Sequence, residues 1–429
     1  MLKAEIAATG DEILCGNLVD TNTAWLADRL LQAGLRVTRH ICVGDDLDEL
    51  AELIGRMASS CQVAVFTGGL GPTPDDLSAK AAALASNQDL VLFEEALQSI
   101  RSFWERLSRA MPESNRKQAL LPEESSVLPN PVGTAPGFSL EMKGCRLYFL
   151  PGVPGEMKRM FSESVLPDIK ARLGEDVRPM RIKVLSTFGV TESGAAEKLR
   201  GFEDRFPNIK LGYRFSFPEI HIRLYQEPAE NMESELQLQQ AADWVRERLG
   251  EAVFSEEGKA FAEVVGDLLR GQGSTLALAE SCTGGYLAHL ITSVSGSSDY
   301  FLLSTVTYAN AAKANLLGVK AETLERFGAV HEETAQEMAL GAKLAAGADF
   351  GLSTTGIAGP SGGTADKPVG TVCIGLATPH KVISRRFTLH YPQRLANIRF
   401  FAYQALNLLR LELIGAQSQE GHNKEHRRP

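Results

Sequence analysis

Apolar and polar positions along residues 1–173 follow two periods, one typical of strands and one typical of helices. Runs rich in β-branched residues predict strands over KAEIAATG, LRVTRHICVG and CQVAVFTGG, and NTAWLADRLLQAG and residues 47–59 between them have helical spacing. Strands that alternate with helices are typical of a parallel sheet covered by helices. Such folds hold ligands where strands end, and glycines and prolines mark two strand ends, at 68–72 and 151–154.

The pattern changes at residue 174, where strands follow one another more closely. Strands are predicted over RIKVLSTFG, NIKLGYRFSF and EIHIRLYQ, with helices over TESGAAEKLRGF and AADWVRERLG. The pattern predicts a small α+β domain over residues 174–256 that resembles a KH domain in shape. KH domains clamp RNA with a GXXG loop, whereas the loop from Gly189 to Gly194 lacks that spacing.

Charge argues against nucleic-acid binding by this domain. Residues 175–256 carry 15 acidic and 11 basic side chains, and the whole chain has a formal net charge of −9. Phosphate contacts from Lys and Arg supply most non-specific affinity for nucleic acids. We therefore expect the KH-like domain to be a structural spacer or dimer element, in a homodimer that binds no nucleic acid.

A second alternation of strands and helices begins after residues 255–259, SEEGK, which we interpret as a linker. It predicts another α/β domain over 257–415, and the polar tail 416–429 is expected to be disordered. The expected fold class is α/β, with two three-layer α/β domains, 1–173 and 257–415, joined by the small α+β KH-like domain.

Composition limits the class of protein further. Hydrophobic residues make up 44% of the chain and charged residues 23%, as in ordinary globular proteins. The chain has no run of 18 apolar residues and no signal peptide pattern, so we expect a cytoplasmic protein with no membrane partner. Its six cysteines include no CxxC pair, which argues against a zinc knuckle or a disulfide framework.

Three loops of the C-terminal domain carry residues suited to nucleophilic chemistry. Ser281 lies between a predicted strand and a helix, where backbone N–H groups can bind an anion or an oxyanion. The alternative is that Ser281 or Thr283 only caps the helix. Tyr308 and Lys313 follow the next strand, and a Gly-rich loop begins at Thr354. Because strand ends meet at one edge of a sheet, we expect these loops to form one pocket.

From about residue 259 to 413 the chain resembles the CinA C-terminal domain, a family of nicotinamide mononucleotide deamidases. The resemblance is carried by ESCTGG, SGSSDYF, VTYANAAK, LGV, TGIAGPSGG and KPVGTV. It implies Ser281 as nucleophile, Lys313 as base and Tyr308 as an assisting residue, without a cofactor. A desolvated, neutral lysine can accept the serine proton. The expected substrate-binding residues are Thr283, Gly284, Gly285, Thr355, Gly356 and Arg399.

Several assignments in this domain stay open at the sequence level. Cys282 is a rival nucleophile, although no motif places a His or Asn beside it. Glu280 could hold either the loop or the lysine. Arg394 is an alternative to Arg399 for the substrate phosphate, and Arg399 could instead be a solvated helix residue. The chain also departs from its relatives at 303–304, where it has Leu-Ser in place of two glycines.

A glycine turn and two acids follow a buried strand in the N-terminal domain, in TGGLGPTPDD. Glycines let backbone amides approach a phosphate closely, so this turn is a candidate phosphate site. Asp75 and Asp76 could hold the divalent cation that neutralises a pyrophosphate. The alternative is that these acids cap the next helix.

This turn, together with GDEIL, VDTN, NRKQ, NPVGTAPG and PGVPGEM, resembles the CinA N-terminal domain, which is similar to molybdopterin-binding proteins of the MoaB and MogA type. The resemblance implies metal-dependent ADP-ribose pyrophosphatase activity, with cobalt or magnesium held by Asp75, Asp76 and Glu156. It also implies that the phosphate-binding residues are Gly68, Gly69, Gly71 and Thr73. Relatives carry an acid soon after DDLT, whereas this chain reads DDLSAK, which predicts weaker metal binding. The alternatives are a pterin-binding protein and a non-catalytic interaction protein linked to competence or DNA damage.

Overall fold

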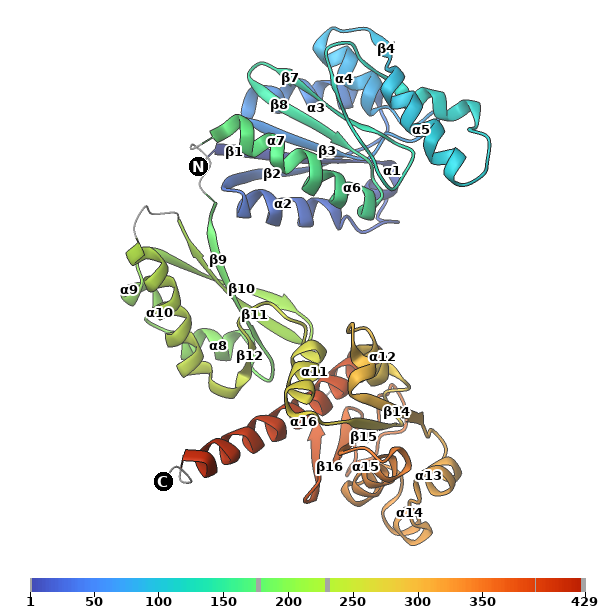
Figure 1. Cartoon of the computed structure of the whole chain (residues 1–429), viewed down its shortest axis with the longest axis vertical. Coiled ribbons are helices and arrows are strands. Elements are labelled where there is room, and N and C mark those ends of the chain that lie inside the picture. The colour runs from blue at the N-terminus through green and yellow to red at the C-terminus, as the bar shows by residue number, and fades with distance from the viewer. Residues whose placement is uncertain (1, 175–178, 228–231, 390, 426–429) are drawn as a thin grey trace. The chain divides into compact units, whose positions relative to one another are not determined.

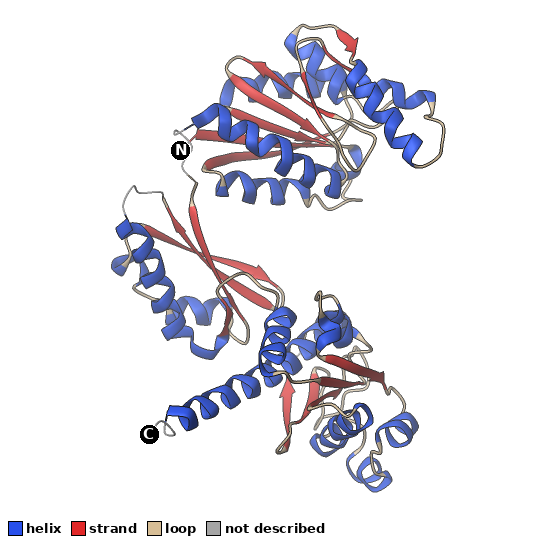
Figure 2. Cartoon of the chain, viewed as in Figure 1, coloured by secondary structure: helices blue, strands red, loops and turns tan. Residues whose placement is uncertain are grey.

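The computed structural model describes residues 2–174, 179–227, 232–389 and 391–425. The chain forms two compact units, 1–182 with 225–234 and 183–224 with 235–429. Figures 1 and 2 show the N-terminal α/β domain, the small α+β domain and the C-terminal α/β domain. The expected α/β class, with two α/β domains and a KH-like domain between them in sequence, is confirmed.

The N-terminal domain is built on a six-stranded sheet of order β2-β1-β3-β8-β7-β6. The first four strands in that order are parallel, and β7 and β6 continue the sheet with antiparallel pairings. The three strands expected here are confirmed as β1, β2 and β3. The strands are β1 (Leu2–Thr9), β2 (Leu35–Val43), β3 (Val63–Thr67), β6 (Ser126–Leu128), β7 (Gly137–Met142) and β8 (Cys145–Leu150).

Helices cover both faces of this sheet (Figure 1). Side chains of α3 and α4 pack on one face, and those of α2, α6 and α7 pack on the other. Between α4 and β6 the chain also forms α5, a 3₁₀ helix (Glu113–Ala119) and the small pair β4–β5. The elements are α1 (Asp11–Leu14), α2 (Asn22–Gln32), α3 (Leu47–Ser60), α4 (Ser78–Ser86), β4 (Leu90–Leu92), α5 (Glu94–Arg106), β5 (Leu120–Pro122), α6 (Pro154–Met160) and α7 (Leu166–Leu173).

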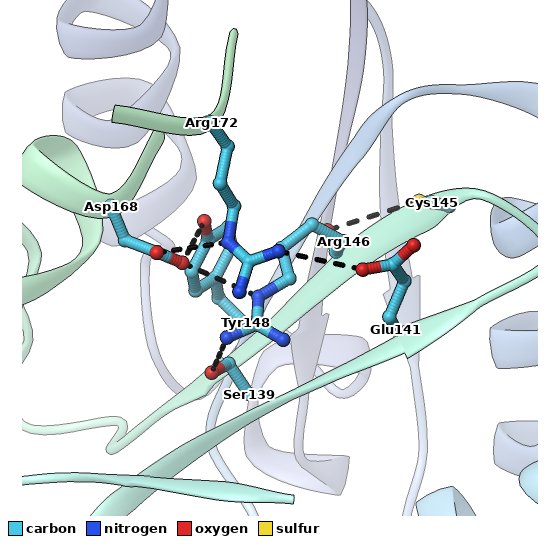
Figure 3. Close-up of polar contacts among 7 residues, drawn as sticks. All are labelled: Ser139, Glu141, Cys145, Arg146, Tyr148, Asp168 and Arg172. Carbon is cyan, nitrogen blue, oxygen red and sulfur yellow. Dashed lines mark hydrogen bonds and ion pairs between the residues drawn. The ribbon is translucent and has the colours of Figure 1, made fainter. Parts of the chain in front are cut away.

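A polar network ties α7 to the sheet (Figure 3). Asp168 accepts a hydrogen bond from the buried Tyr148 hydroxyl at 2.8 Å and pairs with Arg146 at 3.3 Å and Arg172 at 2.9 Å. Burial alone would raise the pKa of Asp168, but the hydrogen bonds from Tyr148 and Arg172 outweigh it and lower that pKa. Because Arg146 pairs in register with Val63, the first residue of β3, the network lies near the amino ends of the strands.

The small domain has a four-stranded sheet of order β10-β11-β9-β12 with helices packed against it. Its Gly-containing loop serves as a helix cap, since the Thr191 hydroxyl accepts the Gly194 N–H at 3.1 Å where α8 begins. The elements are β9 (Arg181–Thr187), α8 (Glu192–Lys198), α9 (Phe202–Arg205), β10 (Ile209–Ser216), β11 (Glu219–Gln226), α10 (Met232–Leu249) and β12 (Val253–Ser255).

The C-terminal domain has a five-stranded sheet of order β14-β13-β15-β16-β17, in which β13, β14 and β15 are parallel. Side chains of α11, α12 and α16 pack on one face, and α13 and α15 contribute to the core on the other. The elements are α11 (Phe261–Gln272), β13 (Leu276–Glu280), α12 (Tyr286–Thr292), β14 (Phe301–Val306), α13 (Asn310–Leu317), α14 (Ala321–Phe327), α15 (Glu332–Ala346), β15 (Phe350–Gly356), β16 (Thr371–Ala377), β17 (Val382–Thr388) and α16 (Arg394–Glu425).

The small domain and the C-terminal domain share a core. Phe188, which follows β9, lies 5.6 Å from Phe261 and 5.9 Å from Phe400 between ring centroids. The Arg410 guanidinium on α16 donates to the carbonyls of Glu251 at 2.5 Å and Val253 at 3.4 Å. The segment 255–259, expected to be a plain linker, is therefore flanked by packed contacts on both sides.

One expectation about the chain end differs from the structure. Helix α16 continues to Glu425, whereas the tail from 416 was expected to be disordered, and 426–429 lie outside the described residues. Ala, Gln, Glu and Lys are good helix formers, so a polar sequence can extend a helix that packing has already started. Of the helices in the described ranges, none is both long enough and apolar enough to cross a membrane.

Candidate functional site

Ser281 and Lys313 meet at the carboxyl ends of two neighbouring parallel strands. Ser281 directly follows β13, and Lys313 lies on α13, which begins soon after β14 ends. The Lys313 Nζ lies 3.1 Å from the Ser281 Oγ, within hydrogen-bond distance. Lys313 is fully buried and Ser281 is 8% exposed. The sequence-predicted nucleophile and base are therefore in direct contact.

The surroundings of Lys313 favour the neutral amine. Burial lowers the pKa of Lys313 below its ordinary value, because desolvation penalises the ammonium form. Among the described residues, no carboxylate contributes to the shift of its pKa. The backbone oxygens of Thr307 at 2.8 Å and Tyr308 at 3.1 Å accept its hydrogens. A neutral amine has two N–H donors for these two carbonyls, which leaves its lone pair for the Ser281 hydroxyl.

Cys282 does not have the properties of a nucleophile. It is 5% exposed and packs in the apolar core of the domain. Burial raises the pKa of its thiol to about 12, so the thiolate is not populated near neutral pH.

Glu280 is the last residue of β13, and its carboxylate lies at the amino end of α12. Its carboxylate accepts the backbone N–H groups of Gly285 at 3.0 Å, Leu287 at 3.1 Å and Ala288 at 2.8 Å. These are the donors that a helix start leaves unsatisfied. Of the two roles considered for Glu280, the structure therefore shows the one that holds the loop.

This arrangement changes the expected substrate contacts. Thr283 is buried and its hydroxyl lies 2.6 Å from that of Thr354. The cavity beside Ser281 is not lined by Thr283, Gly284 or Gly285. The backbone N–H of Gly285 is instead bound by the carboxylate of Glu280. The expectation that residues 283–285 bind the substrate is not supported by this geometry.

The cavity beside Ser281 has a volume of about 350 Å³. Thr355 and Gly356 line it as expected, together with the loop from Ile357 to Gly362. Arg394 also lines it and donates to the Gly359 carbonyl at 2.6 Å. Arg399 is exposed and is not among the lining residues, so the structure favours Arg394, the alternative weighed against it.

Tyr308 lies at the edge of this cavity and is 64% exposed. Its hydroxyl accepts a hydrogen bond from the Arg394 guanidinium at 3.2 Å. The contact of Tyr308 with Lys313 is made by its backbone oxygen. An assisting role of the phenol in proton transfer stays a prediction.

A second cavity, of about 590 Å³, lies at the carboxyl ends of β1, β3 and β8. Gly68, Gly69 and Gly71 line it, as expected for a phosphate cradle. No Lys, Arg or His is among its described lining residues. Six carboxylates line it: Glu12, Asp20, Asp45, Asp75, Asp76 and Glu156. Burial, followed by the charges of Asp11, Glu12 and Asp75, raises the pKa of Asp45.

The proposed metal ligands share this cavity without forming a three-ligand centre. Asp76 accepts the backbone N–H of Thr73 at 2.8 Å, and Glu156 accepts from Asn130 at 2.6 Å. Within the described ranges, no three His, Cys, Asp or Glu side chains are grouped so that they could hold an ion. Thr73 itself does not line the cavity. The alternative of a helix cap also fails, because Leu77 occupies the N-cap position of α4 and no side chain caps that helix.

Three family models match the chain one after another. Residues 5–171 match a model described as a probable molybdopterin binding domain. Residues 182–255 match the damage-inducible protein CinA KH domain, and residues 258–413 match the CinA C-terminal domain.

Curated relatives match the chain over nearly its whole length. A CinA-like protein of Desulfosudis oleivorans is 47% identical over 411 residues, which cover 96% of this chain and 100% of that protein. The chain belongs to the CinA family. A second CinA-like protein, from Desulforapulum autotrophicum, is 44% identical over 96% of this chain and 99% of its own length. The solved structure of a CinA protein of unknown function from Thermoplasma acidophilum is 35% identical, with a TM-score of 0.37, and covers 39% of this chain and 97% of its own.

In this CinA-family chain the two cavities lie within the two matched α/β regions, and each contains residues that the sequence singled out. Sequence reasoning did not assign Glu280 as the residue that binds the start of α12. The signal available was its position as the last residue of a strand, immediately before a Gly-rich helix start.

Proposed function

We propose that the C-terminal domain of this CinA-family chain hydrolyses the amide of nicotinamide mononucleotide, giving nicotinate mononucleotide and ammonia. The observation that carries the proposal is the 3.1 Å contact between Ser281 and a fully buried Lys313 of lowered pKa. A serine hydroxyl is a weak nucleophile until a neighbouring base takes its proton.

The reaction would begin with transfer of the Ser281 hydroxyl proton to Lys313 as the Ser281 Oγ attacks the amide carbon. The tetrahedral intermediate would then collapse as Lys313 returns that proton to the leaving nitrogen, which releases ammonia and leaves a nicotinoyl ester on Ser281. A water molecule, deprotonated by Lys313, would hydrolyse the ester and restore Ser281. Lys313 thus acts as base and acid in turn.

Arg394 is the residue we assign to the substrate phosphate. It lines the same cavity as Ser281 and carries a guanidinium, which matches the geometry of a phosphate. Its hydrogen bond to Tyr308 would hold the guanidinium in place at the cavity edge. The function is tested by incubating the full chain with nicotinamide mononucleotide and measuring ammonia and nicotinate mononucleotide.

The rate of this reaction is expected to rise with pH. Only the neutral amine of Lys313 can accept the serine proton, so kcat should increase as pH rises through the pKa of Lys313, with a midpoint below the ordinary value of 10.5. The measurement is kcat against pH between 5 and 10 in buffers of constant ionic strength. A kcat that is flat, or that falls with rising pH over this range, contradicts a lysine base.

For the N-terminal domain we propose cleavage of ADP-ribose to AMP and ribose 5-phosphate. Its cavity lies at the carboxyl ends of parallel strands and includes Gly68, Gly69 and Gly71. With six carboxylates and no basic side chain among the described lining residues, it would repel a pyrophosphate in the absence of cations. Mg²⁺ commonly takes one or two carboxylates and completes its shell with substrate phosphates and water. The side chains fit an ion that arrives with the substrate, rather than a preformed three-ligand site.

This activity is expected to depend on a divalent cation and on Asp75, which is exposed beside the cavity. Asp75→Asn removes a charge while keeping the side-chain shape, and we expect AMP release from ADP-ribose to fall by about tenfold or more. The assay compares cobalt, magnesium and chelator for the wild type, Asp75→Asn and the control Glu52→Gln, which changes an exposed acid of α3 outside the cavity lining. Equal turnover with and without chelator would refute the metal requirement.

A pterin ligand is the second candidate for this cavity, because residues 5–171 match a model described as a probable molybdopterin binding domain. The two candidate functions, pterin binding and ADP-ribose cleavage, predict different results in a binding assay and in an assay of AMP release. A pterin-binding protein would bind molybdopterin and leave ADP-ribose intact, whereas the proposed pyrophosphatase would release AMP.

A further inference from the structure

Two residues that line the N-terminal cavity each have a buried polar atom without a hydrogen-bond partner. Among the described residues, nothing donates to or accepts from the Oδ1 of Asn22 or the Oγ1 of Thr9. Asn22 is 8% exposed and Thr9 is 4% exposed, and both line the 590 Å³ cavity. A buried polar group without a hydrogen bond costs free energy, and such groups at a cavity indicate that a ligand supplies the missing partner.

The orientation of the Asn22 amide is fixed by its neighbours. Its Nδ2 donates to the Thr67 hydroxyl at 3.1 Å and to the Gly152 carbonyl at 2.8 Å. Thr67 gives its own hydrogen to the Pro151 carbonyl at 3.1 Å, so it is an acceptor toward Asn22. If the amide were flipped, its oxygen would lie against two acceptors, the Thr67 hydroxyl oxygen and the Gly152 carbonyl oxygen. The unpartnered atom is therefore an acceptor, and it requires a ligand that donates.

The two residues that follow β3 lie close to Thr9 and carry no side chain that could cover its hydroxyl. A Cβ on Gly68 would lie 2.6 Å from the Thr9 Oγ1, and one on Gly69 would lie 3.2 Å from it. Both residues have positive φ angles, 113° and 66°, which favour glycine. A side chain at either of these positions after β3 would crowd the Thr9 hydroxyl at the end of β1.

The chemistry of the two atoms selects a hydroxyl over an amine. A hydroxyl of the ligand can donate to the Asn22 oxygen and also accept the hydrogen of the Thr9 hydroxyl. An amino group that only donates could reach both oxygens, but it would leave the Thr9 hydrogen without an acceptor. Asn22 contacts Thr67 and Thr9 lies beside Gly68, the next residue, so we take a sugar with neighbouring hydroxyls as the ligand for both side chains. The acidic lining disfavours a phosphate at the same place unless cations accompany it.

We infer that Thr9 and Asn22 form a subsite for a ribose hydroxyl, so that this cavity selects ribosyl ligands over their deoxy analogues. The inference deepens the proposed ADP-ribose cleavage and rests on it for the choice of ligand. It concerns ligand selection at the sugar and not the hydrolytic step.

The test measures binding to the full chain by calorimetry in the presence of Mg²⁺. Ribose 5-phosphate and 2-deoxyribose 5-phosphate are the probes, because neither carries a base amine. The wild type is expected to bind the ribose form at least about tenfold more tightly, since a site built to bind a hydroxyl rejects the analogue that lacks it. Thr9→Val is expected to remove most of this preference.

The variants separate ligand binding from folding. Thr9→Val replaces an unpartnered hydroxyl by a methyl group of similar size, so its melting temperature should equal or exceed that of the wild type. Thr9→Ser keeps a hydroxyl and should keep the preference. Asn22→Leu also removes two hydrogen bonds, so its melting temperature is measured alongside its affinity.

Each result decides for or against the subsite. Equal affinity for the two probes, no measurable binding of either, or a Thr9→Val variant that keeps the preference overturns it. AMP release from ADP-ribose without any ribose preference would leave the proposed function standing and remove the subsite alone. A ribose preference without ADP-ribose cleavage would leave the subsite standing and contradict the proposed function.

Discussion

Ser281→Ala is expected to lower kcat for ammonia release by at least about 10³-fold, because the variant has no atom that can form the ester intermediate. Affinity for nicotinamide mononucleotide should stay close to that of the wild type, since the residue assigned to the phosphate is Arg394. The measurements are steady-state kinetics and calorimetric titration of the full chain.

Variants of the two neighbours of Ser281 identify its base and exclude the thiol. Lys313→Arg and Lys313→Met should each lose about 10²- to 10⁴-fold in kcat, because a guanidinium stays protonated and a thioether has no basic nitrogen. Cys282→Ala should keep most of the activity, since the thiol is protonated and lies in the core. An inactive Cys282→Ala beside an active Ser281→Ala would reverse the assignment.

Glu280→Gln is expected to lower the free energy of unfolding by about 2–4 kcal/mol. The wild-type carboxylate accepts three backbone N–H groups at the start of α12, and hydrogen bonds to a charged group are the stronger kind. The amide variant would turn an NH2 group toward at least one of these donors. The loop that carries Ser281 begins at the next residue, so kcat should fall as well.

Differential scanning calorimetry of the full chain measures the loss of stability, with the N-terminal unit as an internal reference. Ser304→Ala is the matched control, because the Ser304 hydroxyl makes only a 3.4 Å contact with the same carboxylate. The control should change stability by less than about 0.5 kcal/mol. A Glu280→Gln variant as stable as the control would show that the carboxylate is not needed at this helix start.

The order of strands and helices could be predicted from the sequence because periodicity reports directly which face of an element is buried. The expected helix at 47–59 is α3 (Leu47–Ser60), and the strand over STLALAES contains β13. The continuation of α16 beyond residue 415 could not be predicted, for the opposite reason. The polar residues after 415 have no apolar face, so nothing in their spacing distinguishes an extended helix from a disordered tail.

The contact between Ser281 and Lys313 was predictable because both follow parallel strands that are neighbours in the sheet. The choice between Arg394 and Arg399 as the residue for the substrate phosphate could not be predicted from the sequence. Five residues along a helix correspond to a rotation of about 140°, so the two arginines point to different sides of α16. Which side faces the cavity depends on how the helix packs against β15 and β16, and that is a property of the tertiary structure.

The aromatic contacts of Phe188 with Phe261 and Phe400 change how the chain can be divided. Three segments can be recognised along the sequence, yet the second and third bury side chains in a single apolar cluster. Cutting the chain before residue 257 would remove Phe188 and Phe254 and leave the surface of α11 and α16 uncovered. The segment that contains Ser281 and Lys313 therefore shares part of its apolar core with the small domain, and we expect the two to unfold together.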